Sequence, residues 1–208
     1  MIDLTTLITY IIIVLGFVFI PGPATLLTMA RAASSGTKVG IATGAGIAAG
    51  DIVHTMMAIV GLSAIIATSA LLFSIVKYAG AAFLIYLGIR AMLEKPPLGI
   101  SARTLAITAG QAFRQAIVAE VLNPKTALFF LAFLPQFVRS DNGPVVLQLA
   151  ILGAIFVLLG LVSTVVFAVG AGRLGNLVRR HPAIVRWQGK LVGAVYCAVG
   201  VRLALQER

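Results

Sequence analysis

Long apolar stretches separated by short polar connections make up almost the whole chain. A helix needs about 20 mostly apolar residues to cross a bilayer. Six stretches approach or exceed that length: 4–29, 41–67, 71–93, 112–138, 145–171 and 189–205. The first lacks a basic region ahead of it, so we expect it to be a span and not a cleaved signal. The pattern predicts an all-α integral membrane protein with six transmembrane helices in a single domain, 1–208.

Two of these predicted spans carry a helix break near their middle. The breaks are Pro21-Gly22-Pro23-Ala24 in the first span and Asn123-Pro124-Lys125 in the fourth. Because proline has no N–H and clashes with the carbonyl four residues earlier, the carbonyls of Phe17 and Phe19 lose their helical partners. Gly22 would allow an unusual backbone angle. Backbone that is not helical survives at membrane depth only beside protein or water, so paired breaks predict a transport site near the bilayer midplane.

A weak internal repeat accompanies the paired breaks. The third span ends with Gly88-Ile89-Arg90 and the sixth with Gly200-Val201-Arg202, each followed by three apolar residues. Two units, about 1–95 and 108–208, would then hold three spans each. An odd number of spans per unit predicts inverted repeats with broken helices one and four. Chance similarity is the alternative, because Leu, Gly and Ala are frequent in all such helices.

Basic residues gather around three of the predicted connections, 31–38, 94–103 and 172–187. Nine Lys or Arg lie in or next to them: Arg31, Lys38, Arg90, Lys95, Arg103, Arg173, Arg179, Arg180 and Arg186. The positive-inside rule therefore places these connections in the cytoplasm and both termini outside. The same distribution explains the formal net charge of +10 without a nucleic-acid partner, since no basic soluble module is present.

Glycines recur at the four-residue spacing that lets transmembrane helices approach closely. They are Gly36, Gly40 and Gly44, then Gly46 and Gly50, and finally Gly189 and Gly193. This spacing predicts helix packing within one subunit, with lipids around it. A homodimer interface is the alternative use of the same motif.

Three ionisable residues, Asp51, Glu120 and Lys125, fall well inside predicted spans, and a charge near the bilayer centre costs at least about 2.5 kcal/mol. Asp51 shares a helix face with small residues and with His54, so its carboxylate could meet water, a cation or a substrate ammonium. His54 is equally compatible with a proton relay and with a hydrogen-bonded packing role. Such residues are functional candidates by default.

Glu120 and Lys125 flank the second break. Pro124 follows Glu120 by four residues, so the freed carbonyl of Glu120 and its carboxylate lie beside the same break. Lys125 opens the next half-helix, where its ammonium adds to the positive end of the helix dipole and favours an anion. Asn123 suits a helix cap. The structural alternative is an ion pair of Lys125 with Asp51 or Glu120 that fixes helix register.

Several motifs together resemble one transporter family. They are Pro21-Gly22-Pro23, the stretch 46–54, Lys77-Tyr78-Ala79-Gly80 leading to Tyr86-Leu87-Gly88, and Leu122-Asn123-Pro124-Lys125 followed by Phe129-Phe130-Leu131-Ala132-Phe133-Leu134-Pro135-Gln136-Phe137. This set is similar to the lysine exporter and homoserine/threonine exporter (LysE/RhtB) family. The resemblance implies export of an amino acid or close derivative across a bacterial inner membrane, driven by an ion gradient. Glu120 departs from the neutral residue expected there, which bears on the kind of substrate.

The expected mechanism is secondary export by alternating access, without a cofactor or bound metal. The substrate carboxylate would bind at the half-helix ends and its ammonium at an acidic side chain, which would also take up the coupling proton. The predicted substrate-binding residues are Pro21, Gly22, Pro23, Ala24, Asp51, Asn123, Pro124 and Lys125, and the predicted ion-coupling residues are Asp51, Glu120 and His54.

Two other functions are weighed against amino-acid export. An inorganic cation exporter would use the same carboxylates, but the chain has only two histidines and one cysteine, too few for a soft-metal ligand cluster. An intramembrane enzyme would need a nucleophile with its base, for which Ser163, Thr164 and His54 supply the residue types alone.

Overall fold

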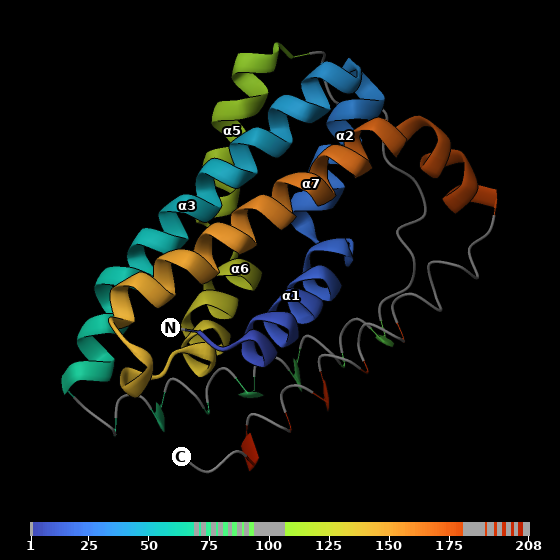
Figure 1. The fold of residues 1–208 in the computed structure, drawn as a ribbon. Coiled ribbons are helices and arrows are strands. Elements are labelled where there is room, and N and C mark those ends of the chain that lie inside the picture. Colours follow the sequence, from blue (N-terminus) through green and yellow to red (C-terminus); the bar gives the residue numbers. More distant parts are fainter. Residues whose placement is uncertain are drawn as a thin grey trace.

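The computed structural model describes residues 2–68 and 107–180, with scattered positions between 71 and 93 and between 190 and 205. Every regular element in the two continuous ranges is helical, which confirms the predicted all-α class (Figure 1). The α-helices are α1 (Leu4–Phe19), α2 (Pro23–Ser35), α3 (Thr37–Thr68), α5 (Ala109–Val121), α6 (Pro124–Leu128) and α7 (Val145–Arg180). A π-helix η1 (Phe129–Phe133) and the 3-10 helices η2 (Leu134–Phe137) and η3 (Ser140–Asn142) follow α6.

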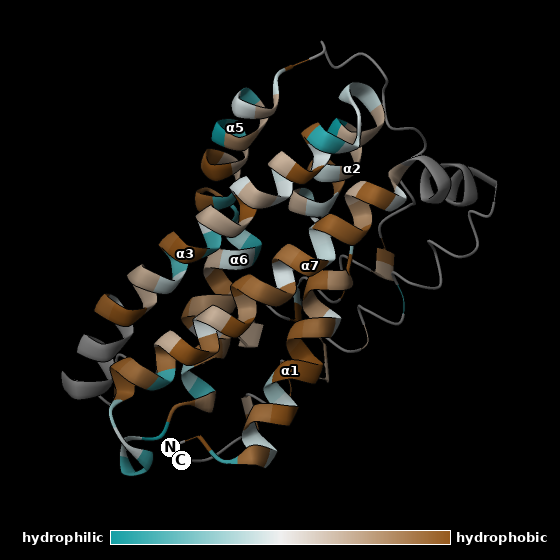
Figure 2. Cartoon of the chain, turned by 45° about the horizontal axis from the view of Figure 1, so that its top comes forward, coloured by the Kyte–Doolittle hydropathy of each residue, from teal (hydrophilic) through white to brown (hydrophobic). Residues whose placement is uncertain are grey.

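Within the described residues, two helices are apolar and long enough to cross a membrane, Thr37–Gly61 of α3 and Val145–Ala171 of α7. The number rises to four if each bent pair counts as one span: α1 with α2, bent by 50°, and α5 with Pro124–Phe137, bent by 45°. Figure 2 shows hydrophobic residues along most of α1 and α7 and hydrophilic ones beside α6, inside the bundle. The chain is therefore a membrane protein.

The predicted spans 71–93 and 189–205 lie largely outside the described residues. The same holds for the repeated Gly-x-Arg motifs, the Gly189 and Gly193 pair, and most of the connections 94–103 and 172–187. The six-span count and the inverted repeat therefore stay predictions.

Both predicted breaks are present. Helix α1 ends before the first and α2 begins at Pro23, while α5 ends before the second and α6 begins at Pro124. Each of these prolines sits at the first helical position, where the missing N–H is harmless. The expectation about Gly22 is wrong: its φ of −113° and ψ of −171° are ordinary extended values that any residue adopts. A different need for glycine appears at the site.

Two expected connections are shorter than their sequence pattern suggested. The stretch 31–38 is a single-residue turn at Gly36, whose φ of 93° favours glycine, and Arg31 and Lys38 are helical. Helix α7 continues to Arg180, so 172–180 is helical as well. A helix does not stop where its apolar face ends, because polar residues such as Arg and Asn are compatible with helical backbone.

Helix α3 packs along α2, α5 and α7 (Figure 1). These contacts are close because glycines, which have no side chain, lie at them. An added Cβ at Gly50 would lie 2.6 Å from the Glu120 Cβ, and one at Gly44 would lie 2.6 Å from the Thr164 hydroxyl. An added Cβ at Gly153 of α7 would overlap Thr55. Gly44 and Gly50 serve packing within one subunit, as predicted, and Gly153, which the glycine spacing did not single out, does the same. The homodimer stays a prediction.

An aromatic cluster fills the bundle between the breaks and the end that carries the amino terminus. Tyr10, Phe129 and Phe133 are each at most 2% exposed. The ring centroids of Phe17 and Phe129 are 4.5 Å apart, and those of Phe129 and Phe156 are 4.8 Å apart. The Tyr10 hydroxyl donates to the Leu152 carbonyl at 2.9 Å. This cluster closes the bundle on one side of the breaks.

Asp3 caps α1 at that end. It accepts hydrogen bonds from the Thr6 hydroxyl at 2.7 Å and from the Thr6 amide at 2.9 Å, which hold the pKa of its carboxyl below the usual value. Arg139 is close enough to interact electrostatically with Asp3. The last turn of α2 and the start of α5 lie at the opposite end of the bundle (Figure 1), where Arg31 donates to Gln115 at 2.9 Å.

Candidate functional site

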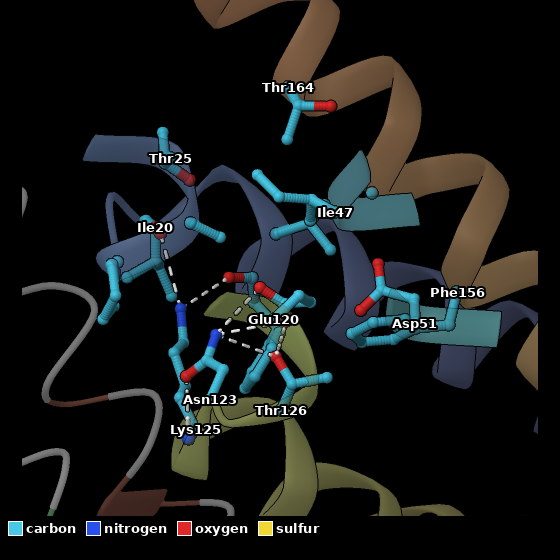
Figure 3. Close-up of a pocket in the computed structure, with 16 residues that line it drawn as sticks. Ile20, Thr25, Ile47, Asp51, Glu120, Asn123, Lys125, Thr126, Phe156 and Thr164 are labelled. Atoms are coloured by element: carbon cyan, nitrogen blue, oxygen red, sulfur yellow. Dashed lines mark hydrogen bonds between the residues drawn. The ribbon is translucent and has the colours of Figure 1, made fainter. Parts of the chain in front are cut away.

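A cavity of about 40 Å³ lies between the two breaks (Figure 3). By the volume that a buried water requires, it admits a few water molecules. Its polar lining comes from α2, α3, α5, α6, α7 and the second break, and consists of Thr25, Asp51, Glu120, Asn123, Lys125, Thr126 and Thr164. Its remaining lining consists of Phe17, Val18, Ile20, Gly22, Pro23, Ala24, Ile47, Phe156 and Gly160.

Lys125 reaches from the second break to the first. Its ammonium donates to the carbonyls of Phe17 at 3.3 Å and Ile20 at 3.5 Å, and lies 4.3 Å from the centre of the Phe17 ring. The Phe17 carbonyl is one that Pro21 deprives of a helical partner, as the sequence predicted. Lys125 therefore neutralises the negative end of α1, where a cation is favourable.

Gly22 makes this contact possible. An added Cβ there would lie 3.0 Å from the Lys125 nitrogen and 3.3 Å from its Cδ. A side chain at position 22 would thus displace the ammonium from the end of α1. The glycine is required for space and not for backbone conformation.

Ser163 of α7 supports the same helix end. Its hydroxyl donates to the Val18 carbonyl at 2.7 Å, so a second carbonyl freed by the break has a side-chain donor. In an apolar medium, backbone groups released by a break need such internal partners.

Glu120 joins the two sides of the second break. Asn123 Nδ2 lies 3.1 Å from each carboxylate oxygen of Glu120, and the Thr126 hydroxyl donates to Oε1. Asn123 also caps α6, because its side-chain oxygen accepts from the Lys125 amide at 3.1 Å. The predicted positions of the Glu120 carboxylate and the Asn123 cap are confirmed. The carboxylate of Glu120 is well supplied with donors although only 2% of the residue is exposed.

His54 of α3 holds the backbone of the same break. Its Nε2 lies 2.9 Å from the Glu120 carbonyl, and since a carbonyl can only accept, Nε2 carries the proton. Its ring stacks on Phe130 with centroids 5.8 Å apart. These contacts match the hydrogen-bonded packing role that the sequence left open.

Asp51 differs from Glu120 in its partners. It is 2% exposed, and within the part of the chain that the structure describes, its Oδ1 is buried without a hydrogen-bond partner. Its Oδ2 faces Gly160, where an added Cβ would lie 3.3 Å away. Glu120 is close enough to interact electrostatically with Asp51. A buried carboxylate oxygen is unfavourable unless water, a proton or a cation meets it.

The amino end of α2 faces the same cavity through Gly22, Pro23, Ala24 and Thr25. The first amides of a helix have no intrahelical acceptor and carry the positive end of the dipole. The cavity thus combines an anion-favouring helix end, the Lys125 ammonium and the Asp51 carboxylate, whose Oδ1 has no partner among the described residues. Such a combination suits a small molecule that carries an amino group.

Comparison with known proteins decides the family. Residues 15–207 match the family model of the LysE type translocators. The chain belongs to this family. It is accordingly a transporter and not an enzyme, which removes the enzyme alternative.

Among the relatives of this translocator is a homoserine/homoserine lactone efflux protein of Salmonella typhimurium, 30% identical over 184 residues that cover 88% of each chain. An uncharacterized membrane protein of Vibrio cholerae is 28% identical over 97% of this chain and 98% of its own length. A Bacillus subtilis membrane protein, YrhP, is 37% identical over 74% of this chain and 77% of its own. No solved structure matches the chain.

The structure of this LysE type translocator brings most predicted site residues together. Gly22, Pro23, Ala24, Asp51, Glu120, Asn123 and Lys125 line the cavity, whereas Pro21, Pro124 and His54 are not among its lining residues. The two prolines break the helices, and His54 acts on the backbone of Glu120. No cluster of three or more potential metal ligands occurs among the described residues.

Sequence reasoning missed several lining residues of the translocator: Phe17, Thr25, Thr126, Phe156 and Gly160. Thr126 follows Pro124 by two positions, as Thr25 follows Pro23, so a search for hydroxyls in the first turn after each proline would have found both. Thr164 appeared only as a nucleophile candidate, although a hydroxyl pair in the middle of an apolar span is a signal in itself. Nothing in the sequence distinguishes Phe17 or Phe156 from other apolar residues.

Proposed function

We propose that the chain is a secondary exporter of an amino acid or close derivative, with the cavity between the two breaks as its substrate site. The observation that carries this proposal is Asp51, which lines the cavity and whose buried Oδ1 has no hydrogen-bond partner among the described residues. The LysE family and the Salmonella efflux relative support the class of transport.

The substrate ammonium binds Asp51 in this proposal, in preference to Glu120, because Glu120 already accepts from Asn123 and Thr126. The substrate carboxylate lies at the amino end of α2, near Gly22 and Ala24, beside the Lys125 ammonium. Pro21, Pro23 and Pro124 contribute by creating the helix ends, and Asn123 by capping the second one.

The substrates named for the Salmonella relative favour Asp51 as the main anchor. Homoserine has both an amino group and a free carboxylate, whereas its lactone keeps the amino group but has no free carboxylate. A site that takes both compounds must recognise the shared ammonium. The buried Oδ1 of Asp51, which has no hydrogen-bond partner among the described residues, provides such recognition, because charge-assisted hydrogen bonds are the strong ones.

Alternating access follows from the size and surroundings of the cavity. A volume of about 40 Å³ admits water but not an amino acid, so the helices must separate for a substrate to enter. The aromatic cluster is the barrier on the side of the amino terminus. The repeat units 1–95 and 108–208 would rock against each other as inverted repeats. In both units, side-chain donors bind carbonyls at the helix break, which supports a similar structure for the two units.

Proton influx is the proposed driving force. Asp51 takes up a proton from outside after the substrate ammonium leaves and releases it to the cytoplasm before the next substrate binds. Glu120 and His54 are further candidates for this coupling. Among the described residues, Lys125 also lines the cavity, and Tyr10 is close enough to interact electrostatically with Asp51.

The proposed location is the bacterial inner membrane with both termini outside. Arg31 and Lys38 lie at the end opposite to Asp3, and Asp141 lies in the turn before α7, at the end of Asp3. A positive excess at one end orients a membrane protein with that end in the cytoplasm.

Counterflow in proteoliposomes tests the proposal. Vesicles loaded with an unlabelled compound are given trace labelled homoserine, homoserine lactone, threonine, lysine or glycine, and accumulation of at least one label is expected. Uptake of none of these or of other amino acids, together with uptake of a divalent metal, would establish the inorganic cation exporter instead.

A further inference from the structure

The carbonyl end of α1 has the make-up of a small cation site. The carbonyls of Phe17 and Ile20 point at one position, which the Phe17 ring also faces. This position lies at the negative end of a half-helix in the middle of an apolar span. Transporters with broken helices use such half-helix ends and unwound carbonyls to bind Na⁺.

In this protein the position is filled by a side chain. The Lys125 nitrogen lies 3.3 Å and 3.5 Å from the two carbonyl oxygens and 4.3 Å from the ring centre. The ammonium arrives from α6, so it also links the two broken spans. Glu120 adds an attractive electrostatic interaction from the second break.

We propose that Lys125 is a tethered cation that occupies a monovalent cation site at the end of α1. A free Na⁺ or K⁺ is therefore not needed at this position in the wild-type protein. Removal of the ammonium opens the site to a small free cation of the ammonium or alkali-metal class.

Gly22 sets the size of the site. An added Cβ would lie 3.0 Å from the Lys125 nitrogen, so a methyl group at position 22 would take up part of the room that the cation needs. Gly22→Ala therefore offers a way to close the same site without touching the carbonyls.

The test is a thermal melt of purified Lys125→Ala in detergent, without substrate, in choline chloride or in equal concentrations of NaCl, KCl or methylammonium chloride. At least one small cation should raise the melting temperature of the variant by about 3 °C relative to choline, as expected for a ligand whose concentration is well above its Kd. The wild type and Lys38→Ala, an equivalent change at an exposed lysine, should show no difference. A variant that melts equally in all four salts would overturn the proposal.

A second variant keeps the test specific. The double change Gly22→Ala with Lys125→Ala should lose the cation response, because the new methyl group intrudes on the emptied position. An unchanged response would mean that the cation binds elsewhere, which would also overturn the proposal.

Wild-type transport gives an independent measurement should Lys125→Ala fail to fold. Counterflow by the wild type should run at the same rate in NaCl and in choline chloride, and a requirement for Na⁺ would contradict a tethered cation. The melting experiment contains no substrate, so its failure leaves the proposed export function standing. A failed counterflow panel likewise leaves the melting result standing.

Discussion

Three ionisable side chains have different tasks in the cavity. Lys125 neutralises the end of α1, and Glu120 joins α5 to α6 through Asn123 and Thr126. Asp51 has an oxygen that no described residue satisfies. The first two groups maintain the broken backbone, with Lys125 also beside the proposed position of the substrate carboxylate, and Asp51 is the one suited to the substrate ammonium.

This division predicts the outcome of a double change at Lys125 and Glu120. Lys125→Gln should lose most transport, because a neutral amide cannot neutralise the carbonyl end of α1. If the two residues served only as counter-ions, Lys125→Gln with Glu120→Gln should restore activity, since removing both members of a buried pair is often nearly neutral. We expect no restoration, because each has separate partners.

Transport rates of both single variants, the double variant and Lys38→Gln decide this point, with membrane levels measured alongside. Lys38→Gln removes an exposed charge and should behave as the wild type. A double variant that recovers wild-type transport would show that ion pairing is the whole role of Lys125.

Single residues were predictable where they contrast with their surroundings. Asp51, Glu120 and Lys125 stand out as charges in apolar spans, so the sequence identified them. The role of Gly22 was not predictable, because it depends on Lys125, which is distant in the chain. Thr126 and Gly160 owe their importance to neighbours on other elements, and a single sequence does not report which helices touch.

At the scale of elements, the two helix breaks create the site. They release carbonyls that take side-chain donors: Lys125 and Ser163 at the end of α1, and His54 at Glu120. Each break also starts a new half-helix at the cavity. Pro21 and Pro124 are not among the lining residues of the cavity, so their effect is on the backbone, whereas Pro23 both starts α2 and lines the cavity.

Pro124→Ala should therefore lose transport while the protein still inserts and folds. Alanine supplies an amide proton for the Glu120 carbonyl and is favoured over proline inside a helix by about 3 kcal/mol. A continuous helix would displace His54 from that carbonyl and reorient Asn123 and Lys125. Transport by Pro124→Ala, Pro21→Ala and the control Pro144→Ala, a change at an exposed proline, is the measurement.

Pro144→Ala should transport normally. Near wild-type export by both Pro21→Ala and Pro124→Ala would mean that the breaks are packing kinks and that the substrate site lies elsewhere.

The elements themselves were predictable to different degrees. The positions of both breaks were predicted correctly from the prolines, since the effect of proline on a helix is local. The ends of α3 and α7 were underestimated, because apolar patterns mark the membrane-embedded part, whereas α3 begins at Thr37, directly after Gly36, and α7 extends to Arg180. The π-helix η1 was missed. It immediately precedes η2, which contains Pro135, and such changes of register leave no distinct pattern in the residues.

At the scale of the whole molecule, the bundle is asymmetric along its length. A large cluster rich in aromatic residues closes the side toward the amino terminus, and a smaller cluster of Met29, Ala32, Phe167, Ala168 and Ala171 lies on the other side of the breaks. The proposed orientation makes the aromatic side the outer one.

Cysteine labelling in spheroplasts tests this orientation. In a Cys197→Ala background, a cysteine at Asn142 should react with an impermeant thiol reagent, and a cysteine at Ser35 should react only after permeabilisation. The basis is the concentration of Lys and Arg at the Ser35 end. The reverse reactivity would invert the topology and, with it, the assignment of the aromatic side.

The most direct test of the account is counterflow by purified wild-type protein beside Asp51→Asn. Asparagine keeps the size of the side chain but removes the charge that would bind an ammonium, so exchange should fall about 10- to 100-fold. Asp141→Asn, the same change at an exposed turn, should leave exchange unaffected. If the wild type exchanges amino compounds and Asp51→Asn exchanges them equally well with the same half-saturation, the substrate ammonium does not bind Asp51, and the cavity between the breaks is not the site described.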